Sequence, residues 1–209
     1  VLEGDSNNAA DTSTDDIAFA SGVTLTAGTT ITLDATTGKM SGGVLDLLAK
    51  DGITINDSLT AAGILTINAD TDQPDNVGTL TVADGATVGT SGGNALNITA
   101  DDLNLNTSGK LDSGAAATKI TVSDGGSIGL GNGATVVGMR ISGAELQNIT
   151  ATGLTIGGTN STIFVDGVTA ANSNNISGTL TLDATNDNAV IQFTTATSTF
   201  NALSAKADD

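Results

Sequence analysis

Three carboxylates lie within six residues in the segment Asp70-Thr-Asp72-Gln-Pro-Asp75, which contains the single proline. Hard cations such as Ca²⁺ bind several oxygen ligands that loops of this kind supply. The segment lacks the EF-hand pattern and the Gly-Gly-x-Gly-x-Asp repeat of calcium-binding β-rolls. Asp70, Asp72 and Asp75 are therefore candidate Ca²⁺ ligands, with a solvated insertion loop as the alternative reading, and no other cofactor is expected.

Enzymatic chemistry has few residues to draw on. The chain has no His and no Cys, which excludes nucleophilic catalysis by either residue. Glycoside hydrolysis needs two facing carboxylates, which the abundant Asp could supply. However, there is no Trp or Tyr on which a sugar could stack, and Arg140 is the sole arginine. We therefore predict that the protein is not an enzyme.

The acidic composition points to turns. The net charge is −17, and only Glu3 and Glu145 among the 23 acidic residues are Glu. The short Asp side chain bonds nearby backbone amides in turns, whereas Glu favours helices. The charge argues against nucleic acid and anionic membranes as partners. No apolar run is long enough to span a bilayer, so no membrane insertion is expected.

Short apolar-x-apolar triplets run along almost the whole chain. Each predicts a strand of minimal length, with two side chains facing inward and a polar one facing out. Such strands bury too little surface alone and must stack on copies of themselves. Examples are Val23-Thr-Leu25, Ile31-Thr-Leu33, Ile53-Thr-Ile55, Leu80-Thr-Val82, Ile120-Thr-Val122, Leu154-Thr-Ile156 and Leu180-Thr-Leu182.

Internal repetition supports this stacking. Residues 80–89 match 120–129 in residue type, an offset of 40 that suggests two coils of 20, and residues 31–36 recur at 180–185. The strands at Val23 and Ile31 reappear at Leu45 and Ile53. Strands spaced closely and evenly within each coil suggest three faces per coil. We therefore predict an all-β fold, a parallel β-solenoid (β-helix) of roughly triangular section with coils of about 20 residues; a β-sandwich of many short strands is the competing architecture.

The pattern divides the chain into three parts. Residues 1–16 are expected to be a polar N-terminal leader or cap, residues 17–203 a single β-solenoid domain, and residues 204–209 a frayed C-terminus. Helix is expected to be nearly absent. The segment 43–50 is the one that resembles a helical turn, and its Leu45/Leu47 alternation favours a strand.

Segments such as Gly63-Ile-Leu-Thr-Ile-Asn-Ala-Asp70 and residues 94–106 resemble, in texture, the filamentous-haemagglutinin-like β-helical surface proteins of bacteria. The resemblance implies a right-handed parallel β-helix, used as an adhesin, stalk or fibre outside the cell. It extends over nearly the whole chain and includes no diagnostic motif. It implies that the protein is located in the extracellular space or on a cell surface.

The two ends of the predicted stack are candidate contact surfaces. A solenoid without a cap exposes an unpaired strand edge on which another chain can pair, and no amphipathic capping helix is evident at either end. The apolar residues near the ends could plug the core or dock on a second copy of the chain. These candidate assembly residues are Ile17, Phe19, Val190, Ile191, Phe193, Phe200 and Leu203.

Two further patterns have plainer explanations. Thr-x-Thr triplets, such as Thr24/Thr26 and Thr179/Thr181, could order water on a flat face, but they are irregularly spaced, and Thr is a common outward residue on strands. Sequons that would matter only in a glycosylating source occur at Asn56, Asn97, Asn106, Asn148, Asn160 and Asn175.

Together these observations favour a structural subunit or segment of an extracellular fibre or stalk, whose main partner is itself. The subunits would assemble end to end through strand pairing. The alternative is an adhesin segment that binds a surface glycan or a host surface on a lateral face.

Overall fold

The computed structural model describes residues 1–4, 15–36, 38–73, 76–135 and 138–208. The protein is all-β, and in the described residues every strand pair of the four sheets is parallel. Two single-turn helices, α1 (Gly143–Gln147) and α2 (Ala170–Ser173), interrupt the strands in this part of the chain. Within these described ranges, no helix is long and apolar enough to cross a membrane.

Three sheets begin near the N-terminus. In spatial order, sheet A holds β1 (Leu2–Glu3), β4 (Ile31–Asp34), β7 (Ile53–Ile55), β10 (Leu80–Val82) and β13 (Leu103–Asn104). Sheet B holds β2 (Ile17–Phe19), β5 (Met40–Gly42), β8 (Leu59–Ala61), β11 (Thr87–Thr90), β14 (Lys110–Asp112) and β18 (Ile149–Thr150).

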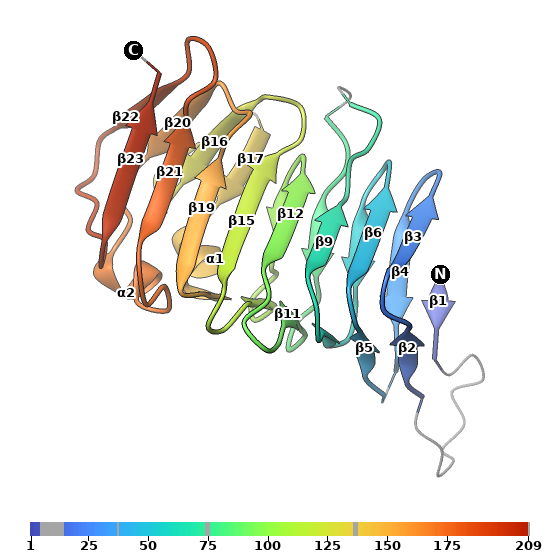
Figure 1. Cartoon of the computed structure of the whole chain (residues 1–209). Coiled ribbons are helices and arrows are strands. Elements are labelled where there is room, and N and C mark those ends of the chain that lie inside the picture. The colour runs from blue at the N-terminus through green and yellow to red at the C-terminus, as the bar shows by residue number, and fades with distance from the viewer. Residues whose placement is uncertain (5–14, 37, 74–75, 136–137, 209) are drawn as a thin grey trace.

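Sheet C runs the length of the molecule and faces the viewer in Figure 1. It holds β3 (Val23–Ala27), β6 (Leu45–Ala49), β9 (Leu65–Asn68), β12 (Leu96–Ala100), β15 (Ala117–Val122), β19 (Gly153–Gly157), β21 (Leu180–Ala184) and β23 (Leu203–Ala207). Sheet D, in the C-terminal part, holds β17 (Gly138–Ile141), β16 (Ser127–Leu130), β20 (Thr162–Val165) and β22 (Val190–Phe193).

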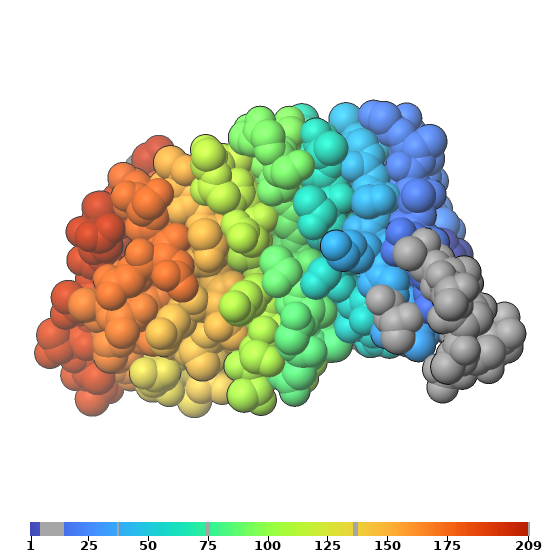
Figure 2. Space-filling model, turned by 90° about the horizontal axis from the view of Figure 1, so that it is seen from below, coloured from blue at the N-terminus to red at the C-terminus, as the bar shows by residue number. Residues whose placement is uncertain are grey.

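The chain visits the sheets in rotation. From β1 to β12, each strand pairs with the strand three places further along the chain, so successive strands in this part lie in different sheets. The molecule is consequently ordered along one axis, and the colours of Figure 2 run broadly from the N-terminal to the C-terminal end. Sheet D departs from this order, because β17 lies outside β16.

The predicted triplets all form strands, and the reason is their alternation. In β7 and β10 the two apolar residues are fully buried, and the Thr between them faces outward. The buried Leu, Ile, Val and Ala side chains form one continuous core cluster from Ile31 to Ala189. Burial of these apolar rows is the main favourable term that holds such short strands in place.

The lengths of the passages differ from the predicted regular repeat. The first predicted recurrence is confirmed, since Val23 pairs with Leu45 and Ile31 with Ile53. Further along sheet C the passages become unequal. Leu45 pairs with Leu65, whereas Leu65 pairs with Leu96, so the second of these passages is much the longer. Inserted loops account for the longer passages.

The sequence matches do not mark stacked copies. Leu80 lies in sheet A and Ile120 in sheet C, so the match between them does not span two passages through one sheet. Likewise Ile31 lies in sheet A and its matching residue Leu180 in sheet C. The matches reflect a shared alternation and turn chemistry, which strands of different sheets need equally.

Both termini contribute strands where the sequence suggested a leader and a frayed end. Leu2 pairs with Leu33 in sheet A, and residues 5–14 of the expected leader lie outside the described residues. Residues 204–207 continue β23, which pairs with β21 from Leu180↔Leu203 to Ala184↔Ala207. Ser204-Ala-Lys-Ala207 looks polar, but its Ala side chains continue the inward-facing positions of β21.

The Asp residues act in turns, as their excess over Glu predicts. The Oδ1 atom of Asp34 accepts a hydrogen bond from the Thr36 amide at 3.0 Å, and Asp112 accepts one from Gly114 at 2.8 Å. Other carboxylates reach the next passage: Asp57 Oδ2 accepts from the Ala35 amide at 2.8 Å. Asp carboxylates therefore accept hydrogen bonds from turn amides that would otherwise lack a backbone acceptor.

Candidate functional site

A polar cavity of about 450 Å³ opens where sheet A ends and sheet D begins. Strand β13 forms one side, strand β17 the other, and α1 follows directly after β17. The cavity is lined by Thr79, Asp102, Leu103, Asn104, Asn106, Arg140, Ser142 and Glu145. It brings together the only arginine and one of the two glutamates of the chain.

Carboxylates join the two strands at this junction, where no pairing between the described strands β13 and β17 continues the ladder. The Oδ1 atom of Asp102 accepts hydrogen bonds from the amides of Leu103 and Arg140, both at 2.9 Å. The Oε1 atom of Glu145 accepts one from the Leu105 amide at 3.3 Å. Two side chains thus satisfy backbone donors that a neighbouring strand would otherwise have paired.

Helix α1 fixes the position of Glu145. Ser142 is its N-cap, and the Ser142 amide and hydroxyl donate to Glu145 Oε2 at 2.9 and 2.8 Å. The Glu145 amide in turn donates to the Ser142 hydroxyl at 3.3 Å. This reciprocal capping box orients the carboxylate before anything enters the cavity.

The charged side chains that line the cavity differ in how far they are buried. Burial raises the pKa of the Asp102 carboxyl above its ordinary value, the nearby Glu145 carboxylate adds to this, and the two amide hydrogen bonds oppose it. The Arg140 guanidinium is exposed, and its Nε donates to the Ala134 carbonyl at 3.0 Å. Among the described residues Lys50 and Asp72 form the one ion pair, and Arg140 forms none.

Sequence reasoning did not find this site. Asp101 and Asp102 are adjacent carboxylates, which on a strand point to opposite faces and so make a weak metal site, and the sole arginine, Arg140, is an argument against catalysis. Two signals were available: the rare Arg140 and Glu145 lie close together in the sequence, and Ser142-Gly-Ala-Glu145 has the capping-box spacing. That spacing also predicts α1, which the expectation of almost no helix passed over.

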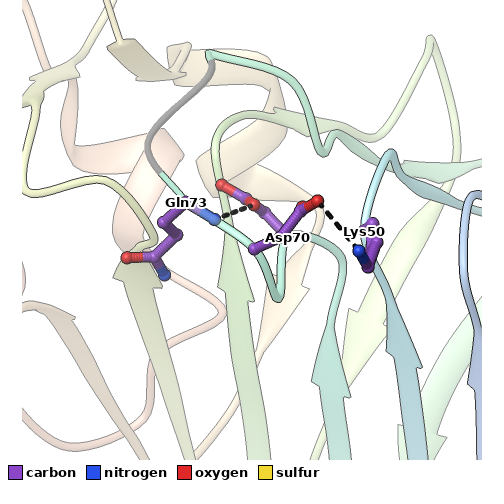
Figure 3. A network of polar contacts seen from close by, with 4 residues as sticks. Lys50, Asp70 and Gln73 are labelled. Atoms are coloured by element: carbon purple, nitrogen blue, oxygen red, sulfur yellow. Dashed lines mark hydrogen bonds and ion pairs between the residues drawn. The ribbon is translucent and has the colours of Figure 1, made fainter.

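The three candidate calcium ligands have different surroundings. Asp70 is fully buried, and its Oδ2 accepts from the Ser123 hydroxyl at 2.5 Å. Its Oδ1 accepts from the Gln73 amide at 3.3 Å (Figure 3). Asp72 is exposed and pairs with Lys50 at 3.4 Å. Asp75 lies outside the described residues. In the described part of the chain, no three acidic side chains are grouped as a metal site.

The candidate assembly residues lie at the two ends of the sheets. On the N-terminal side, Ile17 and Phe19 belong to β2, the outermost strand of sheet B, and both pack partly buried against the core. On the C-terminal side, Val190, Ile191 and Phe193 belong to β22, the outermost strand of sheet D.

The C-terminal end leaves part of the core uncovered. Phe193 pairs with the buried Val165 and is 52% exposed, and Leu203 pairs with the buried Leu180 and is 38% exposed. Phe200, between β22 and β23, packs partly buried against the core. Inward-facing apolar positions thus reach solvent where no further described strand covers them.

The structure shows which threonines stack in neighbouring strands and which sequons are exposed. Thr32, Thr54 and Thr81 stack in sheet A, although their spacing in the sequence is irregular. In sheet C, Asp46 and Lys119 interrupt the outward row that begins at Thr24. A continuous water-ordering face is therefore absent from the described strands of sheet C. Among the sequons, Asn160 is fully buried, whereas Asn106 and Asn175 are exposed.

Known proteins give no further guidance to the site. No family model matches the chain, and neither the curated proteins nor the solved structures contain a significant match to it. The resemblance to filamentous-haemagglutinin-like proteins therefore stays a prediction.

Proposed function

We propose that the chain is a roughly triangular parallel β-solenoid, in which inserted loops lengthen some of the coils, and that it serves as a structural subunit of an extracellular fibre or stalk. Copies would join end to end, with β23 of one copy pairing in parallel with β3 of the next. The observation that carries this proposal is the match between these two outermost strands of sheet C, which are equal in length.

The solenoid architecture is supported by the order in which the chain visits its sheets. Strands β12, β13 and β14 follow one another in sheets C, A and B, and the next strand, β15, returns to pair with β12. One circuit of the chain therefore corresponds to one added strand in each sheet. The buried apolar positions of all three sheets belong to a single core cluster.

The free backbone groups of the two ends are complementary. The Leu180 amide donates to Ala202 at 3.0 Å and the Asp208 amide to Ala184 at 2.9 Å. Because backbone groups alternate in direction along a strand, the amides of Leu203, Ala205 and Ala207 point away from β21. In β6 the amide of Leu45 donates to Ile64, on the side away from β3. By the same alternation, the backbone amides and carbonyls of Thr24 and Thr26 in β3 point away from β6.

A single register satisfies both backbone and side chains. If Leu203 lies opposite Val23 of the next copy, the free amide of Ala205 meets the free carbonyl of Thr24. In the same register Ala205 faces Leu25, and Ala207 faces Ala27, so inward positions continue inward. The partly buried Val23 and Leu25 and the exposed Leu203 would then be covered, as other core positions already are.

Electron microscopy of the purified chain over a range of concentrations tests the assembly. The strands of sheet C, at the usual spacing of parallel strands, give an axial repeat of about 38 Å per copy. We expect filaments with this repeat. Isolated particles at every concentration would overturn end-to-end assembly while leaving the solenoid architecture to be judged on its own.

The variant Ala205→Pro tests the proposed register. Proline removes the amide of residue 205, which points away from β21 and makes no hydrogen bond to it. Because proline is tolerated at sheet edges, we expect the fold to be retained. We expect filaments to be lost and the circular dichroism spectrum to be unchanged. The matched control is Ser204→Ala. It changes a neighbouring side chain that faces away from the core, and it leaves in place every amide that points away from β21. Filaments of normal length from Ala205→Pro would exclude the β23–β3 contact.

The extracellular location is the part of the proposal that rests on the resemblance and on the stiffness of a stacked parallel core. Antibody labelling of intact source cells tests it directly. Signal that requires permeabilised cells would contradict a surface location without bearing on assembly.

A further inference from the structure

The lining of the cavity between β13, β17 and α1 includes a donor group and an acceptor atom that have no partner among the described residues. The guanidinium of Arg140 is anchored through Nε to Ala134, and its two terminal nitrogens have no hydrogen-bond partner in the described part of the chain. Across the same cavity, Oδ1 of Asp102 takes both amide hydrogen bonds, and Oδ2 takes none from the described residues.

The remaining lining supplies further polar groups and no aromatic ring. Asn104 is exposed and its Oδ1 accepts from the Asn106 amide at 2.9 Å, which leaves its amide nitrogen as a donor. Glu145 has both oxygens committed to backbone and Ser142 donors, so its part is to position the surrounding backbone. None of the four Phe residues lines the cavity.

The charge balance narrows the chemistry of a ligand. An anion would be repelled by Asp102, by Glu145 and by a chain with a net charge of −17. A cation would be repelled by Arg140, and the described residues do not group three acidic ligands. A hydroxyl group donates and accepts, so neighbouring hydroxyls can bind an arginine and a carboxylate together without a charge of their own.

We propose that this cavity binds a neutral polyhydroxylated ligand, one or two sugar units of an oligosaccharide, through Arg140 and Asp102. Its volume lies within the range of small-ligand sites. The site is on the side of the molecule, so it locates the lateral glycan contact of the adhesin alternative. It requires one copy of the chain and stands whether or not copies assemble.

The absence of an aromatic platform sets the expected strength. Stacking on a ring contributes much of the apolar contact in a binding site, and here hydrogen bonds must act alone. We expect a dissociation constant of about 1–10 mM for a single site. In a fibre, one such site per copy would bind a multivalent surface far more tightly than a single copy does.

Nuclear magnetic resonance of the ¹⁵N-labelled chain at non-assembling concentration tests the proposal. The probes are glucose, galactose, N-acetylglucosamine and their β-linked disaccharides, with glycine betaine and CaCl₂ as the zwitterionic and cationic comparisons. We expect a saturable shift for at least one sugar at the amides of Leu103, Leu105 and Arg140, because these amides bond the cavity carboxylates.

Two variants separate binding from folding. Asp102→Asn retains an Oδ1 acceptor for both amides and turns the free acceptor into a donor; Arg140→Gln removes the guanidinium. Each is expected to weaken sugar binding about tenfold or more. Lys119→Gln removes the same charge from an exposed position on sheet C and serves as the control with unchanged binding.

Three outcomes would overturn the proposal. They are the lack of a saturable shift for any sugar up to about 100 mM, equal binding by the two cavity variants and the control, and saturable binding of betaine or Ca²⁺ in place of a sugar.

Discussion

At the scale of single residues, this protein uses carboxylates in two ways. Some are buried and accept hydrogen bonds that the fold needs, as Asp70 does from Ser123 and Gln73. Others lie at the surface and contribute charge, as Asp72 does beside Lys50. The two residues are neighbours in sequence and alike in type, so comparing them isolates the effect of burial.

We expect Asp70→Ala to lower the free energy of unfolding by about 1–3 kcal/mol, because it leaves the Ser123 hydroxyl and the Gln73 amide without their acceptor. The exposed control Asp72→Ala removes a surface ion pair and should change it by less than about 1 kcal/mol. Urea unfolding of both variants measures the difference. Equal losses would contradict the structural role given to Asp70.

The pH dependence of stability should differ in sign between two carboxyls. Hydrogen bonds from Asn56 and Thr36 lower the pKa of Asp34, so its stabilisation is present above the unfolded value and is lost as pH falls through the folded value. Burial raises the pKa of Asp102, so its contribution is present at low pH and is lost as pH rises through the folded value.

Unfolding curves across the range on either side of the ordinary Asp pKa of 3.8 check this difference. Asp34→Asn should reduce the loss of stability on acidification. Asp102→Asn, which keeps the Oδ1 acceptor, should gain stability relative to the parent at neutral pH. Parallel pH profiles for the two variants would show that the environments of Asp34 and Asp102 are not opposite.

At the scale of elements, each strand owes its place to the strand stacked on it more than to its own length. Strand β11 shows how close this stacking is. A Cβ atom added at Gly89 would overlap the carbonyl oxygen of Asp112 in the neighbouring β14. A small residue is therefore required there by the approach of two backbones, since Gly89 does not have a positive φ.

We expect Gly89→Ala to destabilise the protein by about 1–3 kcal/mol or more, because backbone atoms of β11 or β14 must move. The control Gly28→Ala, where an added Cβ meets nothing within 4 Å, should stay within about 0.5 kcal/mol. Thermal unfolding of the two variants gives the comparison. A harmless Gly89→Ala would mean that β11 and β14 are not packed as described.

At the scale of the whole molecule, the net charge of −17 opposes contact between copies, while the uncovered core at the C-terminal end favours it. Like charges on separate copies are screened by salt over about 8–10 Å at physiological ionic strength. Assembly of this chain should therefore respond to ionic strength in general, in addition to its dependence on concentration.

We expect sedimentation velocity to show larger species as NaCl rises, with the same result in CaCl₂ at equal ionic strength. Charge screening explains an equal response. A response to CaCl₂ alone would contradict simple screening and point to the predicted ligands Asp70, Asp72 and Asp75. The variant Asp72→Ala would then separate that loop from other acidic positions.

The sequence alone determined the strands that contain the apolar triplets and the direction in which their side chains face. Alternating Val, Ile and Leu around Thr predicts β7 and β10 because a strand has a period of two, and that local rule needs no knowledge of neighbours. It also indicated which apolar residues would lie at the ends, from Ile17 to Leu203, since these occur where the pattern starts and stops.

The tertiary structure alone decided which strands stack and where the cavity forms. Loop insertions shift register without altering alternation, so Leu80 and Ile120 look equivalent in sequence and lie in different sheets. Asp102 and Arg140 are far apart in the sequence and meet only because sheet A ends at β13 and β17 approaches that edge. Contacts of this kind depend on how the circuits of the chain are joined, which short-range sequence patterns do not encode.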